Sequence, residues 1–285
     1  MEPHAAGAAG RLGKHAAPAL ARLVNSRPLR NPARLAGIYL DILQGRGSGT
    51  GWDLAGEVSA AVPFLAGVAD PVIFDVGANV GEWTLGMWRA CGRGRYFAYE
   101  PQDACLPQLK SLPVPNLTVV RSAMSDRAGT LKLYSDVAGS GLASFYERLD
   151  TYLPRQTRVD AVPVTTVDEE LKARGLGRVD FMKVDVEGAE LRVLSGAADA
   201  LSRQAVRSLA FEFGSANIAS RVFFRDCWDL MTGHGYRLWR IAPGGVLVPL
   251  RSYREELEHF RGVSNFVASA ACGDGPHRPG IRAPR

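Results

Sequence analysis

Short apolar runs alternate with amphipathic segments along the chain from Pro71 onward. The runs "VIFDV", "RYFAYE" and "LTVVRSAM" predict strands, and "GEWTLGMWRAC" and "QDACLPQLKSL" between them predict helices. This order predicts right-handed crossovers and a parallel sheet with helices on both faces, so we expect one α/β domain over residues 71–270. The later elements are expected at "TLKLYS", "VDAVPVTTVDEEL", "VDFMKVDV", "AELRVLSGAADAL", "SLAFEF", "RVFFRDCWDLMTGHG", "YRLWRI" and "GVSNFVAS".

The N-terminal part of the chain differs from this pattern. Residues 1–30 are rich in Ala, Gly and Arg, which predicts a disordered basic arm, with a transit peptide as the alternative. Residues 31–70 are expected to form a helical extension. Within it, "NPARLAGIYLDILQG" predicts one amphipathic helix on the edge of the domain, with Asn31 as a possible N-cap and Pro32 at the first helical position.

The net charge of +5 comes from the two ends of the chain. Residues 1–40 carry six basic side chains and one acidic side chain. The proline-containing segment 271–285 is expected to be a flexible tail, and it carries three basic side chains and one acidic side chain. The stretch between them therefore has a net charge of −2. Because the expected domain has no excess of basic residues, no nucleic-acid partner is predicted.

The four cysteines form no C-x-x-C pair and lie near no histidine cluster in the sequence. Neither a zinc site nor a disulfide framework is indicated, and a reducing cytoplasm fits best. No apolar stretch reaches the ~20 residues of a membrane span.

The turn after the first strand indicates a ligand. In "VIFDVGANVGEWT" the strand ends at Asp75, and Gly77 and Gly81 frame a turn into a helix, with Asn79 between them. A dinucleotide fingerprint has a middle glycine where Asn79 stands, and an acid before the first glycine would repel a pyrophosphate. Glu100, at the end of the second strand, suits the two hydroxyls of a ribose. These residues predict S-adenosylmethionine as the cofactor, because that ligand carries an ammonium group as well as a ribose.

Four stretches in order, "FDVGANVGEWT", "YEPQ", "AMSDRAGTLKLY" and "FMKVDVEGAE", resemble the FkbM-type S-adenosylmethionine-dependent O-methyltransferases. The resemblance runs from about Pro71 to Ser269. It implies a Rossmann-like, seven-stranded class I methyltransferase sheet whose final strand is antiparallel. It also implies methylation of a hydroxyl on a sugar, glycolipid, polysaccharide or polyketide-type metabolite. The third stretch adds Ser125 and Asp126 to the expected cofactor-binding residues.

The end of "FMKVDVEGAE" supplies the candidate catalytic residues, Lys183, Asp185 and Glu187. Asp185 is expected at the carboxyl end of a central strand, with Lys183 two residues earlier on the same face. Methyl transfer to an alcohol needs the removal of a proton, which a carboxylate or lysine base performs, or a divalent cation assists. Asp185 and Glu212 are the candidate ligands for Mg²⁺, with Glu187 as a further oxygen donor. A structural alternative for Glu187 and Glu190 is capping of the next helix.

Three alternatives stay open from the sequence. The loop 139–149, with Phe145, Tyr146 and Arg148, is either a lid that contacts a sugar or a surface loop. His234 is either a base or, more in keeping with its Gly-flanked position, a helix cap. Besides O-methyl transfer, the candidates are an N-methyltransferase of nucleic acid or protein, and an inactive S-adenosylmethionine-binding module.

Overall fold

The computed structural model describes residues 16–49, 53–149 and 153–270. The chain forms two units, Met1–Gln44 and Gly45–Arg285. The arm expected at the first 15 residues and the tail expected after residue 270 lie outside the described residues.

The described part of the N-terminal unit is helical, and it includes residues 16–24 of the arm that was expected to be disordered. Residues 16–24 form a helix, and α2 (Arg30–Leu43) follows after a short turn. Leu29 precedes α2 without a side-chain cap, so the expected N-cap at Asn31 is wrong. None of the residues of α2 is buried within the described structure, and α2 belongs to the N-terminal unit.

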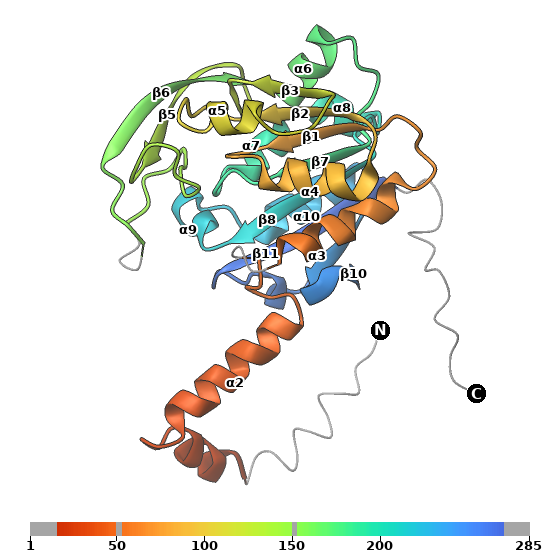
Figure 1. The fold of residues 1–285 in the computed structure, drawn as a ribbon. Coiled ribbons are helices and arrows are strands. Elements are labelled where there is room, and N and C mark those ends of the chain that lie inside the picture. The colour runs from red at the N-terminus through yellow and green to blue at the C-terminus, as the bar shows by residue number, and fades with distance from the viewer. Residues whose placement is uncertain (1–15, 50–52, 150–152, 271–285) are drawn as a thin grey trace, which may run out of the picture. The chain divides into compact units, whose positions relative to one another are not determined.

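Eight strands form the central sheet of the larger unit, in the order β10-β9-β11-β8-β7-β1-β2-β3 (Figure 1). They are β1 (Val72–Val76), β2 (Arg95–Tyr99), β3 (Leu117–Val120), β7 (Phe181–Val184), β8 (Ser208–Gly214), β9 (Tyr236–Ala242), β10 (Val246–Leu250) and β11 (Val263–Ala270). Strands β3, β2, β1, β7 and β8 are parallel, and β11 lies antiparallel between β8 and β9. The predicted α/β class is confirmed.

The sheet differs from the expected seven strands by one edge strand. β10 pairs antiparallel with β9 and extends that edge. The run "LTVVRSAM" is also not one strand: β3 ends at Val120, and Ala123–Met124 (β4) joins a second, three-stranded sheet. Its other strands are β5 (Gly129–Ser135) and β6 (Arg158–Thr165). This small sheet places the loop 139–149 near the carboxyl ends of the large one.

Helices cover both faces of the large sheet. They are α3 (Leu54–Ala61), α4 (Glu82–Cys91), α5 (Leu106–Lys110), α6 (Val167–Ala173), α7 (Glu190–Ser195), α8 (Ala198–Ser202), α9 (Ala216–Ser220) and α10 (Phe224–Gly233), with short 3-10 turns η1 (Val62–Leu65), η2 (Pro243–Gly245) and η3 (Glu255–Leu257). Residues of α3 and α4 share one core cluster with β1 and β7, whereas α6, α7, α8 and α10 share the cluster on the other face. The segment "AELRVLSGAADAL" is therefore two short helices rather than one.

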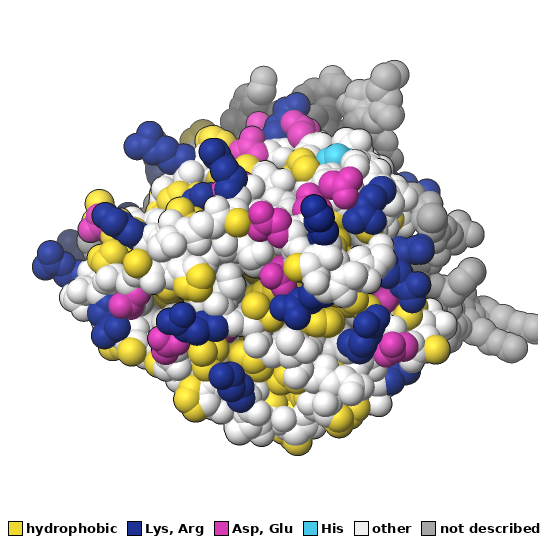
Figure 2. All heavy atoms as spheres, turned by 90° about the horizontal axis from the view of Figure 1, so that it is seen from above, with side chains coloured by type: hydrophobic (Ala, Val, Ile, Leu, Met, Phe, Trp, Pro, Cys, Tyr) yellow, Lys and Arg dark blue, Asp and Glu magenta, His cyan; other side chains and the backbone are white. Residues whose placement is uncertain are grey.

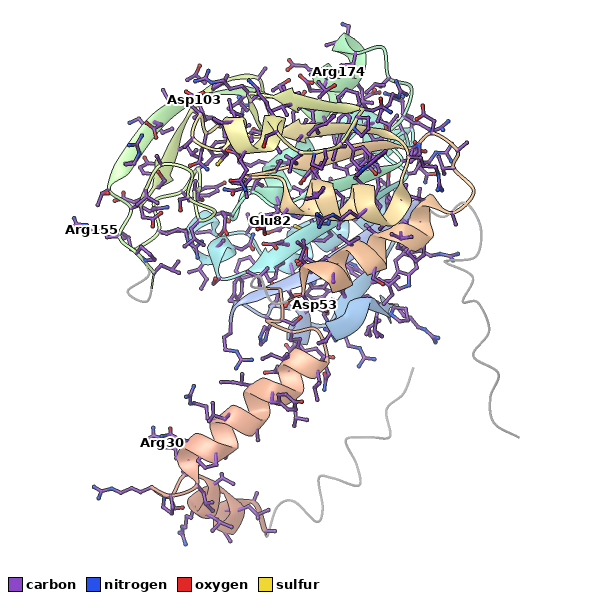
Figure 3. The ribbon with its side chains drawn as sticks, in the orientation of Figure 1. Arg30, Asp53, Glu82, Asp103, Arg155 and Arg174 are labelled. Atoms are coloured by element: carbon purple, nitrogen blue, oxygen red, sulfur yellow. The ribbon has the colours of Figure 1, made fainter. Side chains whose placement is uncertain are left out.

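Helix α3 lies within residues 31–70, where a helical extension was expected but this helix was not delimited. Asp53, labelled in Figure 3, caps this helix by accepting a hydrogen bond from the amide of Gly56 at 2.8 Å, and it also accepts one from the amide of Gly244 at 2.6 Å. These contacts hold α3 against the turn between β9 and β10. Helix α3 thus covers one face of the sheet and packs against β7, the strand that leads to the candidate catalytic residues.

The surface mixes both signs of charge. On the face shown in Figure 2, acidic side chains lie among basic ones, with apolar side chains between them. In the parts of the chain that the structure describes, no helix has the length and apolar character to pass through a bilayer.

Candidate active site

A cavity opens at the carboxyl ends of β1, β2 and β7, where ligands bind in open α/β sheets. The turns after these strands, the small sheet and the loop 139–149 all contribute to its wall. Its lining consists of Gly77, Asn79, Tyr99, Glu100, Pro101, Gln102, Ala123, Met124, Leu133, Ser140, Gly141, Ala143, Phe145, Asp185, Val186 and Glu187. We call it the strand-end cavity.

The turn after β1 brings its backbone to the mouth of this cavity. Gly77 has a φ of +85°, and its amide donates to the carbonyl of Tyr99 at 3.0 Å. Asn79 also has a positive φ of 48°, and its amide donates to Glu100 Oε2 at 2.9 Å. The turn is thus tied to the end of β2, and the two predicted ligand-binding strand ends form one wall.

Glu100 is buried at the edge of the cavity. Its second oxygen, Oε1, accepts a hydrogen bond from the amide of Gln102 at 2.8 Å. Burial raises the pKa of Glu100, while the hydrogen bonds from the amides of Gln102 and Asn79 lower it. Each carboxylate oxygen has a further lone pair, so Glu100 can still accept hydrogen bonds from a pair of ligand hydroxyls.

The charge of the lining limits the kind of ligand. Glu100, Asp185 and Glu187 are its ionisable acids, and no lysine, arginine or histidine is among the described residues that line the cavity. A pyrophosphate would meet carboxylates there, while the nearby cations Lys183 and Arg148 are already paired with Asp185 and Glu187. A ligand with a cationic end, a diol and a flat apolar base fits the lining, because Met124, Leu133 and Phe145 supply the apolar wall. S-adenosylmethionine has all three features.

The loop 139–149 is tied to the cavity wall at several points. The Asn79 side-chain amide donates to the carbonyl of Gly139 at 3.3 Å, and the Gln102 side-chain amide donates to the carbonyl of Ser140 at 2.9 Å. Ser144 Oγ donates to the carbonyl of Glu187 at 2.7 Å. The loop therefore joins the turns after β1, β2 and β7 and forms a fixed side of the cavity.

Lys183 and Asp185 form the ion pair that the strand alternation predicts. Lys183 Nζ donates to Asp185 Oδ2 at 2.7 Å, with the lysine almost buried and the aspartate partly exposed to the cavity. Lys183 also lies opposite Asp75 in the pairing of β7 with β1. Because alternate residues of a strand share a face, these polar side chains lie on the face covered by α3 and α4.

Two residues that the sequence pattern did not identify complete this cluster. Glu57 of α3 accepts a hydrogen bond from Asn265 Nδ2 of β11 at 2.7 Å. Asn265 is paired with Glu212 across the sheet. A cavity of about 10 Å³ lies between Glu57, Lys183, Glu212 and Asn265, which is room for about one water and too little for an acceptor. The only sequence signal for Glu57 is a single acid in an otherwise small and apolar helix.

The carboxylates around Lys183 hold it in its charged form. Burial lowers the pKa of Lys183, but Asp185, Asp75, Glu212 and Glu57 together outweigh burial and raise it above its usual value. A lysine that keeps its proton cannot accept one from a substrate. Of the two kinds of base left open by the sequence, the electrostatics favour the carboxylate.

The side chain of Glu187 is bound to the loop 139–149, and Glu187 itself is not part of a helix. It has a φ of +52° and lies before the start of α7, and its Oε2 accepts a hydrogen bond from Arg148 Nη1 at 2.7 Å. Burial and the neighbouring Asp185 raise the pKa of Glu187 to about 8, against the opposite effect of Arg148. Glu190 is the first residue of α7, and its Oε1 accepts hydrogen bonds from the amides of Val186 and Gly188 in the turn before that helix, each at 3.1 Å.

The metal hypothesis finds no support in this geometry. In residues 16–49, 53–149 and 153–270, no three His, Cys, Asp or Glu side chains come together as a metal-ligand set. The ammonium group of Lys183 takes the position of a cation beside Asp185 and Glu212.

His234 lies far from the candidate base. It is the C-cap of α10 just before β9, and the start of β9 is at the opposite end of the sheet from Asp185.

Several predicted cofactor-binding residues lie behind the cavity wall. Asp75 is buried, accepts a hydrogen bond from Thr84 Oγ1 at 2.6 Å, and does not line the cavity. A Cβ at Gly81 would lie 2.5 Å or less from the side chains of Leu109 and Leu112 of the α5 region, so this glycine serves packing.

Ser125 and Asp126 also lie outside the cavity lining. Ser125 Oγ donates to Asp126 Oδ1 at 2.9 Å, and Arg192 Nε of α7 donates to the same oxygen at 2.7 Å. Although burial raises the pKa of Asp126, the hydrogen bonds from Arg192 and Ser125 bring it down to about 2. The preceding residues, Ala123 and Met124, contact the cavity instead.

The fold and the acidic strand-end cavity together define the methyltransferase class. The model of the Methyltransferase FkbM domain matches residues 75–238, which is more than half of the chain. The chain belongs to the FkbM methyltransferase family, whose members use S-adenosylmethionine. This finding confirms the family suggested by the four sequence stretches.

Individual relatives match over part of their length. Over 157 residues the chain is 30% identical to the methyltransferase sdnD of Sordaria araneosa, covering 45% of this chain and 61% of that protein. Over 149 residues it is 25% identical to the 2-O-methyltransferase NoeI of Sinorhizobium fredii, covering 47% and 60%. The precorrin-6y C5,15-methyltransferase structure from Geobacter metallireducens GS-15 superposes with a TM-score of 0.40 and 13% identity, over 75% of this chain and 87% of that one. The chain thus spans about three fifths of the length of these two curated relatives.

Proposed function

We propose that the protein transfers the methyl group of S-adenosylmethionine to a hydroxyl of a sugar, glycolipid, polysaccharide or polyketide-type metabolite. The observation that carries this proposal is the Lys183–Asp185 pair, joined at 2.7 Å where β7 meets the strand-end cavity. It supplies a fixed carboxylate beside the strand-end cavity. A hydroxyl acceptor needs such a group, because its proton has to leave as the new bond forms.

Donor binding is assigned to the side of the cavity formed by β1, β2 and β4. Glu100 accepts the two ribose hydroxyls through its remaining lone pairs. The apolar side chains of Met124 and Phe145 flank the adenine. The acidic lining favours the ammonium and sulfonium charges, while the amides at Gly77 and Asn79 stay engaged with β2 and Glu100 and keep the turn in position.

Proton removal is assigned to Asp185. When bound, S-adenosylmethionine would supply an activated methyl group, whose carbon the acceptor oxygen would attack as the bond from that carbon to sulfur breaks. Asp185 accepts the hydroxyl proton through Oδ1, because its Oδ2 is held by Lys183. Lys183 keeps its own proton and is a positioning residue. The positive charge of Lys183 lies beside Asp185, where a metal ion would otherwise be needed. We therefore propose that the reaction proceeds without a magnesium site.

Two further observations support the proposed acceptor and compartment. The relative NoeI is a 2-O-methyltransferase, which agrees with a hydroxyl acceptor. Three of the cysteines, Cys91, Cys105 and Cys227, are free thiols in the described structure, which supports a reaction in a reducing cytoplasm.

The test uses purified protein and S-adenosylmethionine with a tritiated methyl group. Glycan, lipid, small-metabolite, RNA and protein fractions of a cell extract are offered separately, and label in each fraction is counted. We expect label in a glycan, lipid or metabolite fraction, stable to alkali as an ether is, and strongly reduced with Asp185→Asn. Transfer to RNA or to protein amines would instead establish N-methylation. Donor binding without transfer to any fraction would indicate the inactive binding module.

A further inference from the structure

Helix α2 of the N-terminal unit carries exposed and partly exposed apolar side chains on one face. Along α2, the residues Leu35, Ile38, Tyr39, Ile42 and Leu43 follow the i, i+3, i+4, i+7, i+8 spacing that places side chains on one helix face. We call this set the α2 stripe. Leu35 is 55% exposed and Tyr39 is 62% exposed. A helix of a soluble protein normally buries such a face, so we expect the α2 stripe to bind another surface.

The preceding helix has the same character. In residues 16–24 the side chains of Leu20, Leu23 and Val24 recur at i, i+3 and i+4 and are all exposed. A short turn joins the two helices, with Ser26 Oγ donating to the carbonyl of Leu23 at 2.6 Å. Two successive helices of one unit therefore both carry exposed apolar side chains.

Basic residues accompany these apolar faces. Residues 16–44 carry four arginines, Arg22, Arg27, Arg30 and Arg34, against the single acid Asp41. Arg30 and Arg34 lie four residues apart at the start of α2, off the stripe (Figure 3 labels Arg30). An apolar helix face bordered by arginines matches a lipid surface that is apolar below its headgroups and negatively charged at them.

We propose that the α2 stripe binds the surface of a membrane that contains anionic lipid. At 14 residues, α2 is shorter than the ~20 residues needed to cross a bilayer, so it lies in the interface with the arginines at headgroup level. A second copy of the chain fits this surface less well, because pairing two such helices would bring two sets of arginines together. Anionic lipid neutralises that charge and covers the stripe at once.

The experiment measures flotation of the full chain with phosphatidylcholine vesicles, with and without phosphatidylglycerol. We expect flotation with phosphatidylglycerol and much less without it. The double variant Leu35→Ser/Tyr39→Ser should bind anionic vesicles at least about 10-fold more weakly, because two large apolar side chains no longer enter the interface. Arg30→Gln/Arg34→Gln should also weaken binding and reduce its dependence on salt.

A matched control removes two equally exposed apolar side chains from the other unit. Ile218 is 55% exposed and Val246 is 53% exposed, and Ile218→Ser/Val246→Ser should float like the wild type. Tyr39→Trp, which keeps an aromatic side chain suited to the interface, should retain binding. Circular dichroism of each variant shows whether its helices have formed, and Tyr39→Trp shows whether the position tolerates change.

Three results would overturn the proposal. The first is equal flotation of wild type and the Leu35→Ser/Tyr39→Ser variant. The second is equal flotation with and without phosphatidylglycerol. The third is a dimer in light scattering that the same double variant dissociates, since the α2 stripe would then bind a second copy of the chain.

Discussion

Gly77 and Asp185 approach each other so closely that no other residue fits at position 77. A Cβ built on Gly77 would lie 1.8 Å from the carbonyl oxygen of Asp185, and the φ of Gly77 is +85°. The turn after β1 and the end of β7 are therefore packed backbone to backbone. This contact sets the distance between the donor side of the cavity and the candidate base.

Gly77→Ala should accordingly damage both stability and activity. The backbone clash and the positive φ together should lower the free energy of unfolding by about 3 kcal/mol or more. Gly92→Ala is the matched control, because Gly92 also has a positive φ, of 64°, but nothing lies within 4 Å of its Cβ position. Gly92→Ala should lower the free energy of unfolding by about 1 kcal/mol. Urea unfolding compares the two, and equal losses would contradict the close approach at Gly77.

Glu100→Gln should weaken binding of S-adenosylmethionine. The amide keeps the shape but loses one acceptor oxygen and the charge, and charged hydrogen bonds contribute about 1.5–3 kcal/mol each, so affinity should fall at least about 10-fold. Isothermal calorimetry measures this. Asp103→Asn is the control, because Asp103 is exposed, is paired with Arg121 and lies outside the cavity. Unchanged affinity in Glu100→Gln would remove Glu100 from the donor site.

Asp185→Asn should reduce turnover by about 10²-fold or more while donor affinity stays nearly constant, as expected for loss of a general base. Chelation should leave the wild type active, because Lys183 provides the positive charge beside this carboxylate. Asp126→Asn serves as the control, since Asp126 pairs with Arg192 away from the cavity. Its turnover should stay close to that of the wild type. Inactivation of the wild type by a chelator, with recovery on adding magnesium, would restore the metal hypothesis.

The stability of the protein should fall as pH rises through neutrality, partly because of Glu57. Burial raises the pKa of Glu57 to about 7 from 4.5, although Lys183 opposes the rise. The folded state thus binds this proton more tightly than the unfolded state does, and the resulting stability is complete below about pH 4.5 and lost as pH rises through about 7.

Glu57→Gln isolates that contribution, because a glutamine cannot ionise but can still accept the hydrogen bond from Asn265. Between about pH 5 and pH 8 its free energy of unfolding should fall less than that of the wild type, by on the order of 2 kcal/mol after allowance for partial exposure. Urea unfolding at both pH values measures the difference. Glu82→Gln, at an exposed position in α4, should follow the wild type. Identical pH dependence in all three proteins would place Glu57 in solvent rather than beside Lys183.

Local patterns in the sequence determined much of the fold and the centre of the site. Strands such as Val72–Val76 and Phe181–Val184 were predictable because uninterrupted apolar runs bounded by turn residues suit a sheet that is buried on both faces. The Lys183–Asp185 contact was predictable for a similar reason, since residues two apart in a strand share a face. The acids at the ends of β1, β2 and β7 belong to one edge of the sheet because parallel strands end together.

Tertiary structure alone decided which residues complete the site. Glu57 and Asn265 are 208 residues apart in the sequence, and only the packing of α3 on β11 brings them together. Arg148 meets Glu187 because the small sheet places its loop over β7, and the positive φ of Glu187 then turns that side chain toward the loop. Asp75 and Gly81 matched a ligand-binding motif, but Asp75 accepts a hydrogen bond from Thr84, and Gly81 packs against leucines near α5. Periodicity reports which face of an element is buried, but what lies against that face depends on contacts distant in the chain.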